Sequence, residues 1–394
     1  MKKVVWTGIL GCVVLGAVLM GGAGWGAEGT VPAAGNGVRG ATTMATTTAA
    51  TTAPATAATI AATARQKTVQ MRGFSMRLVD PSPKAVASYL AGIDELADMG
   101  CTWVNFPVTA YQETARSETL AVSKADIPSE ADILRVMARA KARGMGIMMM
   151  PTVLLRQPGT KDWRGVINPP NWDTWFESYR QFIVAMARIA QKGDVDIFVV
   201  GSELLSTEQD QFRWQKTIEM IRYVYKGKLT YSANWDHYGT VSFWDQLDYV
   251  GMNNYYELSK EKNAKHEDGS DVTVEELNKT WAPIQNNILT FAARQKKPFM
   301  FTEVGWHNLE NTLKEPWNYV ATGKIDLEVQ RRAFASFVET WGKVPKEQFM
   351  GAFIWEWYPE GKVVDGNYSH GTYSLQATPA LEVVKKWFSD RKFE

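Results

Sequence analysis

Eight short runs of apolar residues recur along the chain from about residue 66 onward, and within them apolar and polar positions do not alternate. Strands that are buried on both faces have this pattern, and parallel sheets bury both faces of their strands. The eight runs are Met71–Leu78, Thr102–Thr109, Gly146–Leu154, Val195–Val200, Leu229–Trp235, Tyr249–Tyr255, Pro298–Val304 and Gly351–Trp357. The pattern therefore predicts eight buried parallel strands.

Helical patterns separate these runs, with apolar residues spaced three and four apart. Ser129 is a typical N-cap residue, and Gly144 lies just beyond the expected end of its helix. Thr378 and Pro379 form the N-cap and first-turn proline of a last helix. Eight strand–helix units predict an α/β fold, a single (β/α)8 TIM barrel over residues 67–394. A doubly wound sheet is the alternative, but no glycine-rich phosphate loop follows the first strand.

The first 66 residues have a different character. Lys2 and Lys3 precede an apolar stretch that runs from Val4 to Met20, which is the pattern of an export signal. Because the stretch is almost long enough to span a bilayer, we interpret residues 1–27 as a signal peptide or an N-terminal membrane anchor, with lipidation at Cys12 a more distant alternative. Residues 28–66, rich in Ala and Thr, are predicted to be a disordered linker. We expect an exported protein, either secreted, periplasmic or tethered to the cell surface.

Composition limits the function classes. The 43 basic and 42 acidic side chains leave a formal charge of +1, which provides no basic face for nucleic acid. Two Cys cannot form a disulfide framework, and the four His have no metal-ligand spacing, so we expect neither a metal nor a cofactor. The 16 Trp are more informative, because indole rings pack in cores and also stack on flat or ring-shaped ligands.

Two of the predicted strands end in a glutamate. Glu203 follows the fourth run, and Glu303 lies at the end of the seventh. Reactive groups of a (β/α)8 barrel lie at the carboxyl ends of its strands, and a carboxylate beside buried apolar residues is costly unless the site uses it. Two carboxylates across one mouth are what retaining glycoside hydrolysis requires. Glu356 is a third candidate, but strand alternation predicts that it pairs with a helix residue outside the barrel.

On these residues the chain resembles clan A glycoside hydrolases, whose acid/base ends the fourth strand and whose nucleophile ends the seventh. It is most similar to glycoside hydrolase family 113, the β-1,4-mannanases. The matching segments are Trp163–Ile167, Gly201–Glu203, Leu229–Trp235, Phe243–Trp244, Leu247–Gly251, Thr302–Gly305 and Phe353–Trp355. The resemblance implies an endo-β-mannanase that uses no cofactor, with Glu203 as acid/base and Glu303 as nucleophile. Its partner would be a β-linked polysaccharide or oligosaccharide, and it would meet a membrane only through an uncleaved anchor.

Two departures from the family pattern bear on specificity. Ser202 stands where the clan usually has an Asn that bonds the sugar 2-hydroxyl. Thr152 and Leu154 stand where relatives tend to carry His and Asp. The alternatives are therefore a retaining hydrolase or transglycosylase acting on another β-glycan such as glucan or xylan, or a non-catalytic carbohydrate-binding barrel.

Further residues near the strand ends are predicted to bind substrate. Tyr255 is placed to donate a hydrogen bond to Glu303, and Asn253 shares its face of the sixth strand. Trp355, at the end of the eighth run, is expected to form a platform under the reacting sugar. The other candidates have equally weighted alternatives in packing or local bracing, and they are Arg164, Asn234, Trp235 and Trp306.

Overall fold

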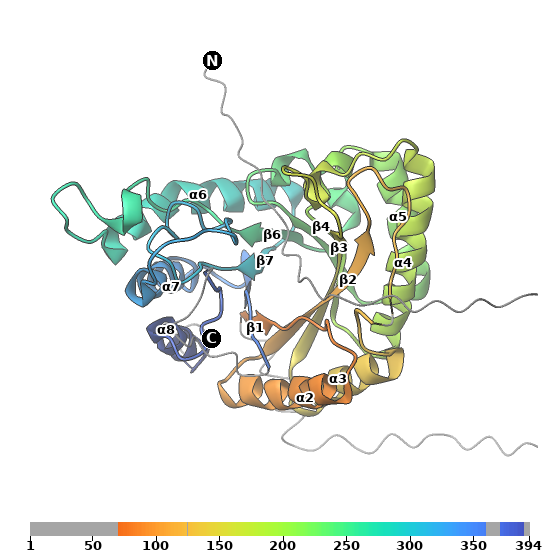
Figure 1. Ribbon diagram of the computed structural model, residues 1–394, viewed down its shortest axis with the longest axis horizontal. Coiled ribbons are helices and arrows are strands. Elements are labelled where there is room, and N and C mark those ends of the chain that lie inside the picture. The colour runs from red at the N-terminus through yellow and green to blue at the C-terminus, as the bar shows by residue number, and fades with distance from the viewer. Residues whose placement is uncertain (1–69, 124, 360–370, 390–394) are drawn as a thin grey trace, which may run out of the picture.

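The computed structural model describes residues 70–123, 125–359 and 371–389 (Figure 1). The predicted signal or anchor segment at 1–27 and the predicted linker at 28–66 lie outside the described residues. Within these described ranges, no helix is both long enough and apolar enough to cross a membrane.

Eight parallel strands close into a barrel in their order along the chain, and helices surround it (Figure 1). The strands are β1 (Met71–Ser75), β2 (Trp103–Gln112), β3 (Gly146–Leu155), β4 (Ile197–Ser202), β5 (Lys228–Ala233), β6 (Val250–Asn254), β7 (Phe299–Val304) and β8 (Phe349–Ile354). β1 pairs with β8 and so closes the barrel. The predicted (β/α)8 barrel is confirmed, and each apolar run overlaps one strand, although the strand ends differ from the predicted ends by up to three residues, as in β1, β2 and β8.

The outer layer consists of helices that follow the strands. Their bounds are α2 (Pro83–Asp98), α3 (Glu130–Ala142), α4 (Trp172–Lys192), α5 (Gln211–Val224), α6 (Val274–Gln295), α7 (Leu327–Trp341) and α8 (Pro379–Ser389). The hydroxyl of Ser129 accepts a hydrogen bond from the Asp132 backbone N–H, as its N-cap position predicts. Gly144 has φ 71°, the left-handed conformation that commonly ends a helix.

Six tryptophans are fully buried in the main hydrophobic core. The fully buried ones are Trp175, Trp214, Trp281, Trp306, Trp341 and Trp387. Trp214, for example, stacks on Phe243 with ring centroids 4.5 Å apart. A smaller apolar cluster fills the barrel interior, where Met148, Met150 and Phe353 are buried together. The high tryptophan content therefore serves mainly the core, and the indoles that remain partly exposed are the ones to consider for binding.

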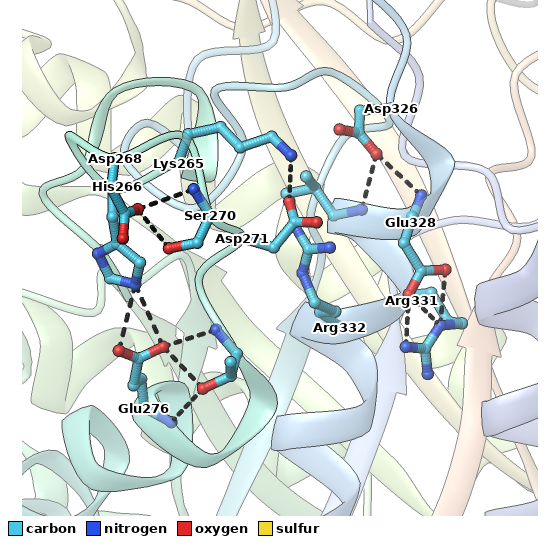
Figure 2. Close-up of polar contacts among 12 residues, drawn as sticks. Lys265, His266, Asp268, Ser270, Asp271, Glu276, Asp326, Glu328, Arg331 and Arg332 are labelled. Carbon is cyan, nitrogen blue, oxygen red and sulfur yellow. Dashed lines mark hydrogen bonds and ion pairs between the residues drawn. The ribbon is translucent and has the colours of Figure 1, made fainter.

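The connection between β6 and α6 is fixed by a polar cluster (Figure 2). Asp271 accepts from Lys265 at 2.6 Å and from Arg332 of α7 at 3.1 Å, so that the connection is joined to the neighbouring helix (Figure 2). Thr273 and Glu276 form a capping box at the start of α6, and His266 contacts Glu276 at 3.2 Å. These contacts order one of the connections that follow the carboxyl ends of the strands.

Candidate active site

The two glutamates predicted from the strand ends lie at the same mouth of the barrel. Glu203 directly follows β4, and Glu303 is the next-to-last residue of β7. Asn253 of β6 is the register partner of Glu303, and its side-chain amide donates a hydrogen bond to Oε1 of Glu203. The end of β6 therefore lies next to both glutamates, which brings Glu203 and Glu303 to the same part of the barrel mouth.

Glu203 is held by charged and neutral donors. Nη2 of Arg164 lies 2.5 Å from Oε2 of Glu203. Arg164 begins a short 3-10 helix, Arg164–Val166, in the connection after β3. Oδ1 of Asn253 accepts from the Trp235 backbone N–H at 2.9 Å, which fixes the amide so that its nitrogen faces Glu203. Of its two predicted alternatives, Arg164 takes the bracing position in this structure.

Glu303 has one hydroxyl donor. The hydroxyl of Tyr255 donates to Oε2 of Glu303 at 2.8 Å, which is the contact predicted from strand alternation. The Tyr255 ring meets Tyr373 edge-on at 6.0 Å, and the Tyr373 hydroxyl donates to the Pro316 carbonyl at 2.5 Å. This packing limits the movement of Tyr255 and so fixes the direction of its hydroxyl.

Burial and mutual repulsion favour retention of a proton by the carboxylate pair. Glu203 is 8% exposed and Glu303 is 3% exposed. Burial, together with the charge of Glu203, raises the pKa of Glu303 to about 8, against the lowering effects of Arg164 and of the Tyr255 hydrogen bond. Burial also raises the pKa of Glu203, and the Arg164 guanidinium opposes that rise. Both shifts favour the retention of a proton by the pair, and a two-carboxylate glycosidase needs one carboxyl group protonated and the other ionised.

Partly exposed aromatic rings flank the carboxylates. Trp355 follows β8, is half-buried, and has the guanidinium of Arg77 at 5.8 Å from its ring. Trp235 follows β5, is also half-buried, and stacks on Trp317 with centroids 5.7 Å apart. The structure therefore leaves both predicted platforms at the strand ends with part of their surface open. Asn234 is buried and turns its side-chain oxygen to the Trp235 backbone N–H at 3.2 Å, a local contact.

The structure corrects the role of Trp306. Its side chain is fully buried and packs edge-on against Phe334 at 5.1 Å and Trp281 at 6.4 Å. These partners belong to α7 and α6, so the indole lies in the layer between the strands and the helices. Trp306 therefore has no open face for a sugar ring. Position 306 follows the end of β7 by two residues, where strand alternation no longer determines the direction of a side chain.

The expected pairing of Glu356 with a helix residue is also wrong. Nη2 of Arg77, which follows β1, donates to Oε1 of Glu356 at 3.0 Å, and the Tyr358 hydroxyl donates to the same oxygen at 2.8 Å. Glu356 lies beyond the end of β8, and β8 is the neighbour of β1 in the closed barrel, so the two segments meet at the mouth. The charge of Glu356 reaches Glu303 and contributes to raising its pKa.

Several residues of this mouth had no signal in the sequence. Arg77, Trp317 and Tyr373 come from three connections that are far apart in the chain, and each contacts a site residue only after the barrel closes. The departures from the family pattern can also be located. Oγ of Ser202 is buried with no hydrogen-bond partner among the described residues, and the Thr152 hydroxyl pairs with that of Thr109 at 3.0 Å.

Two other features of the described residues were candidates for a site, a metal cluster and a second cavity. Across residues 70–123, 125–359 and 371–389, no group of three or more His, Cys, Asp or Glu side chains could hold a metal ion. A cavity of about 520 Å³ lies at the opposite end of the barrel and is lined by residues such as Met71, Asp196 and Lys228, which precede or begin their strands. Chemistry in (β/α)8 barrels lies at the other end, at the carboxyl ends of the strands.

Comparison with known proteins agrees with this geometry. The model of Glycoside Hydrolase Family 113 matches residues 84–376. The chain belongs to glycoside hydrolase family 113. It is therefore a glycoside hydrolase with the clan A barrel, as the resemblance of its strand-end motifs predicted. No curated protein matches the chain in sequence.

Solved structures show the same fold at low identity. A family 113 β-1,4-mannanase, described in a complex, is 23% identical, has a TM-score of 0.70, and matches 82% of this chain and 100% of its own. The family 113 β-mannanase from Alicyclobacillus acidocaldarius, in complex with ManMIm, is 23% identical with a TM-score of 0.69, and 82% and 98% of the two chains are covered. A family 5 mannosidase from Rhizomucor miehei is 12% identical with a TM-score of 0.52, over 82% and 92%.

Proposed function

We propose that this family 113 member is a retaining β-glycoside hydrolase that cleaves β-1,4 bonds in mannan-type polysaccharide. The observation that carries the proposal is the pair Glu203 and Glu303, which flank one strand end and have separate hydrogen-bond donors. The similar solved structures that are described as β-1,4-mannanases support the choice of mannan. The apolar stretch in residues 1–27 supports export of the enzyme to where polysaccharides are found.

The proposed reaction has two steps. In the first, Glu203 donates its proton to the glycosidic oxygen while the Glu303 carboxylate attacks the anomeric carbon, so the glycosidic bond breaks and a glycosyl-enzyme forms. In the second, Glu203 takes a proton from water, and that water releases the sugar from Glu303. Glu203 is protonated again and Glu303 is again a carboxylate at the end of the cycle.

The proton must be on Glu203 when the reaction starts. In the free enzyme, the donors Arg164 and Asn253 favour the ionised form of Glu203. A bound glycoside changes this preference, because its glycosidic oxygen accepts a hydrogen bond from protonated Glu203. The positive charge that develops at the anomeric carbon favours ionised Glu303 in the same way. Substrate binding would therefore place the one proton of the pair where the first step needs it.

The partly exposed rings give the proposed sugar positions. Trp355 lies under the reacting sugar, and its neighbour Arg77 provides a guanidinium for hydroxyl groups at the same end of the cleft. Trp235, stacked on Trp317, forms the surface for a sugar further along the chain. Ser202, Thr152 and Leu154 stand where the family pattern has polar residues, so this chain's preference among β-glycans would depend on these three positions.

Replacement of Glu303 tests the proposal. Glu303→Gln removes the nucleophile while keeping the shape of the side chain, and turnover should fall by at least about 10⁴-fold with sugar binding retained. Reducing ends released from mannan, glucomannan, xylan and cellulose identify the glycan, and NMR of the first product shows whether the anomeric configuration is retained. Exposed Glu382 provides a matched control, since Glu382→Gln should leave turnover unchanged.

Two results would contradict the proposal in different ways. If the wild type hydrolysed xylan or cellulose but not mannan, the proposed substrate would be wrong and the proposed mechanism would stand. Saturable binding of a glycan, without hydrolysis by the wild type and without loss of binding in Glu203→Ala, would indicate a non-catalytic carbohydrate-binding barrel.

A further inference from the structure

The backbone at Glu203 has an unusual conformation that its surroundings must maintain. Glu203 has φ 51°, in the left-handed region that favours glycine. The pairing of β4 with β5 also shifts register between Val199 and Ser202, immediately before it. Such a conformation persists only where neighbouring groups hold it. The direction of the Glu203 carboxylate therefore depends on what fixes this turn.

Two hydrogen bonds from β5 fix the turn. The Glu203 backbone N–H donates to the carbonyl of Ser232 at 2.9 Å. The next N–H, of Leu204, donates to the hydroxyl of Tyr231 at 2.8 Å. The first is an ordinary backbone contact, but the second depends on one side chain. Tyr231 is fully buried, so no water replaces it.

The Tyr231 hydroxyl is itself held by a carboxylate. It donates to Oε1 of Glu208 at 3.0 Å, so the hydroxyl accepts from Leu204 and donates to Glu208. Burial raises the pKa of Tyr231 well above its usual value, and the hydroxyl keeps the proton that this chain of hydrogen bonds needs. Burial raises the pKa of Glu208, and the hydrogen bonds that it accepts from Thr240 and Tyr231 oppose this rise by favouring the ionised form.

In the part of the chain that the structure describes, the carboxyl group of Glu208 is buried without a positively charged partner. It is fully buried and accepts from the Thr240 hydroxyl at 2.8 Å, and no ion pair found among the described residues includes it. Its carbonyl accepts from the Ser242 hydroxyl at 2.8 Å. A buried carboxylate without a cation is costly, and groups of this kind are concentrated at functional sites. Through the Tyr231 hydroxyl, Glu208 is linked to the turn that contains Glu203.

We propose that Glu208 and Tyr231 are a positioning pair that sets the direction of the acid/base Glu203. The inference rests on the proposed function, because it assigns a role relative to that acid/base. Glu208 orients the Tyr231 hydroxyl, the hydroxyl holds the Leu204 N–H, and the held backbone keeps Glu203 in its left-handed conformation. Neither residue contacts the substrate.

Tyr231→Phe tests the pair, because it removes only the hydroxyl. The ring keeps its packing against Trp214 and Phe243. A misdirected acid slows cleavage of poor leaving groups, which need protonation, far more than cleavage of activated aryl glycosides, which do not. We expect kcat/KM, which reports the steps up to the glycosyl-enzyme, to fall about 10²-fold on the polysaccharide and less than about threefold on a dinitrophenyl glycoside of the same sugar. The value of kcat should fall on both substrates, because the second step uses Glu203 as a base whatever the leaving group.

Tyr225→Phe is the matched control. Tyr225 is buried as well, and its hydroxyl donates to the Val195 carbonyl at 2.8 Å. Val195 lies just before the start of β4, at the opposite end of that strand from Glu203. Thermal unfolding should show a similar loss of stability in both variants. Only Tyr231→Phe should lose much more kcat/KM on the polysaccharide than on the dinitrophenyl glycoside. Equal losses on both substrates, or a separation in Tyr225→Phe too, would overturn the inference.

A second variant pair keeps the test decisive if Tyr231→Phe does not fold. Glu208→Ala should show the same separation of substrates, and Glu208→Gln should recover much of the activity because its carbonyl still accepts from Tyr231. Equal losses on both substrates in Glu208→Ala would also overturn the inference.

Glu203→Ala identifies which of the two proposals has failed. If it separates the substrates and the Tyr231 and Glu208 variants do not, only the positioning role is wrong. If it leaves both activities intact, the acid/base assignment is wrong.

Discussion

The donors around the two glutamates differ in charge, and this difference governs how the pair responds to pH. A guanidinium and an amide contact Glu203, whereas a neutral hydroxyl contacts Glu303. The charge of Arg164 lowers the pKa of both carboxyl groups, because it lies close to one and within electrostatic reach of the other. Since the pKa values of such a pair belong to the pair as a whole, one substitution should move both limbs of the activity profile.

Arg164→Met should therefore shift the pH profile. In the wild type, kcat/KM should fall as pH rises through about 8, because the pair then loses its last proton and no acid remains. Removal of the cation raises both pKa values, so both limbs should move to higher pH. Arg156→Met is a control from the same connection, where Arg156 pairs with Asp126 away from the site. An unchanged profile in Arg164→Met would contradict this account.

Replacement of Trp306 should affect mainly stability, whereas replacement of Trp235 should affect mainly substrate binding. Trp306→Ala removes a fully buried indole and should lower the free energy of unfolding by about 3–5 kcal/mol, with KM unchanged in the folded fraction. Trp235→Ala removes a half-buried ring at the mouth and should raise KM for long substrates with a smaller loss of stability. Denaturant unfolding and initial rates measure the two quantities. A raised KM in Trp306→Ala would restore its predicted role in sugar binding.

The sequence predicted site residues where strand geometry determines the direction of a side chain. Glu203, Glu303 and Tyr255 lie in strands or directly after them, and period-two alternation or strand ends located them. Trp306 and Glu356 lie past the last residues of β7 and β8, where the chain turns and alternation ends. Their partners are determined by which segments the closed barrel brings together, and that information is not local in the sequence.

At the scale of elements, local signals predicted the helices better than the strand ends. The Ser129 cap and the first-turn Pro379 act within a few residues, so the sequence contains the whole interaction. A strand end depends on where pairing with two neighbours stops. The run Gly351–Trp357 was predicted as a strand, yet β8 is Phe349–Ile354, because its register with β1 and β7 ends at Ile354.

The capping box of α6 gives a measurable case at this scale. The Thr273 hydroxyl accepts from the Glu276 backbone N–H at 3.3 Å, and Oε2 of Glu276 accepts from the Thr273 backbone N–H at 2.7 Å. Thr273→Ala should lower the free energy of unfolding by about 1 kcal/mol, because one N–H at the helix start loses its acceptor. Thr273→Ser keeps the hydroxyl and should be close to the wild type in urea unfolding. Equal stability of the Ala and Ser variants would show that the cap contributes little.

For the whole molecule, the two ends of the barrel have separate tasks. The carboxyl ends of the strands hold the paired glutamates and the open indoles, whereas the amino ends hold ion pairs such as Lys228 with Asp248 at 2.9 Å. The described barrel closes through β1, and the side chain of Gln70 just before it bonds to the Val344 carbonyl at 2.8 Å. The eight strands of the closed ring lie between residues 71 and 354.

A protein that begins at residue 67 should accordingly fold and work without the preceding segment. Its melting temperature and its kcat/KM on a soluble polysaccharide should equal those of the full chain, because all eight strands and every site residue are retained. Removal of the segment should change location instead. The full chain should be exported, and the truncated chain should stay inside the cell that makes it, because the predicted signal lies in residues 1–27. The mass of the exported protein distinguishes cleavage from anchoring. Deletion of residues 28–66 alone is the control, since it keeps the signal and should leave export intact. A truncated protein that aggregates, or loses activity when folded, would show that the domain begins earlier than residue 67.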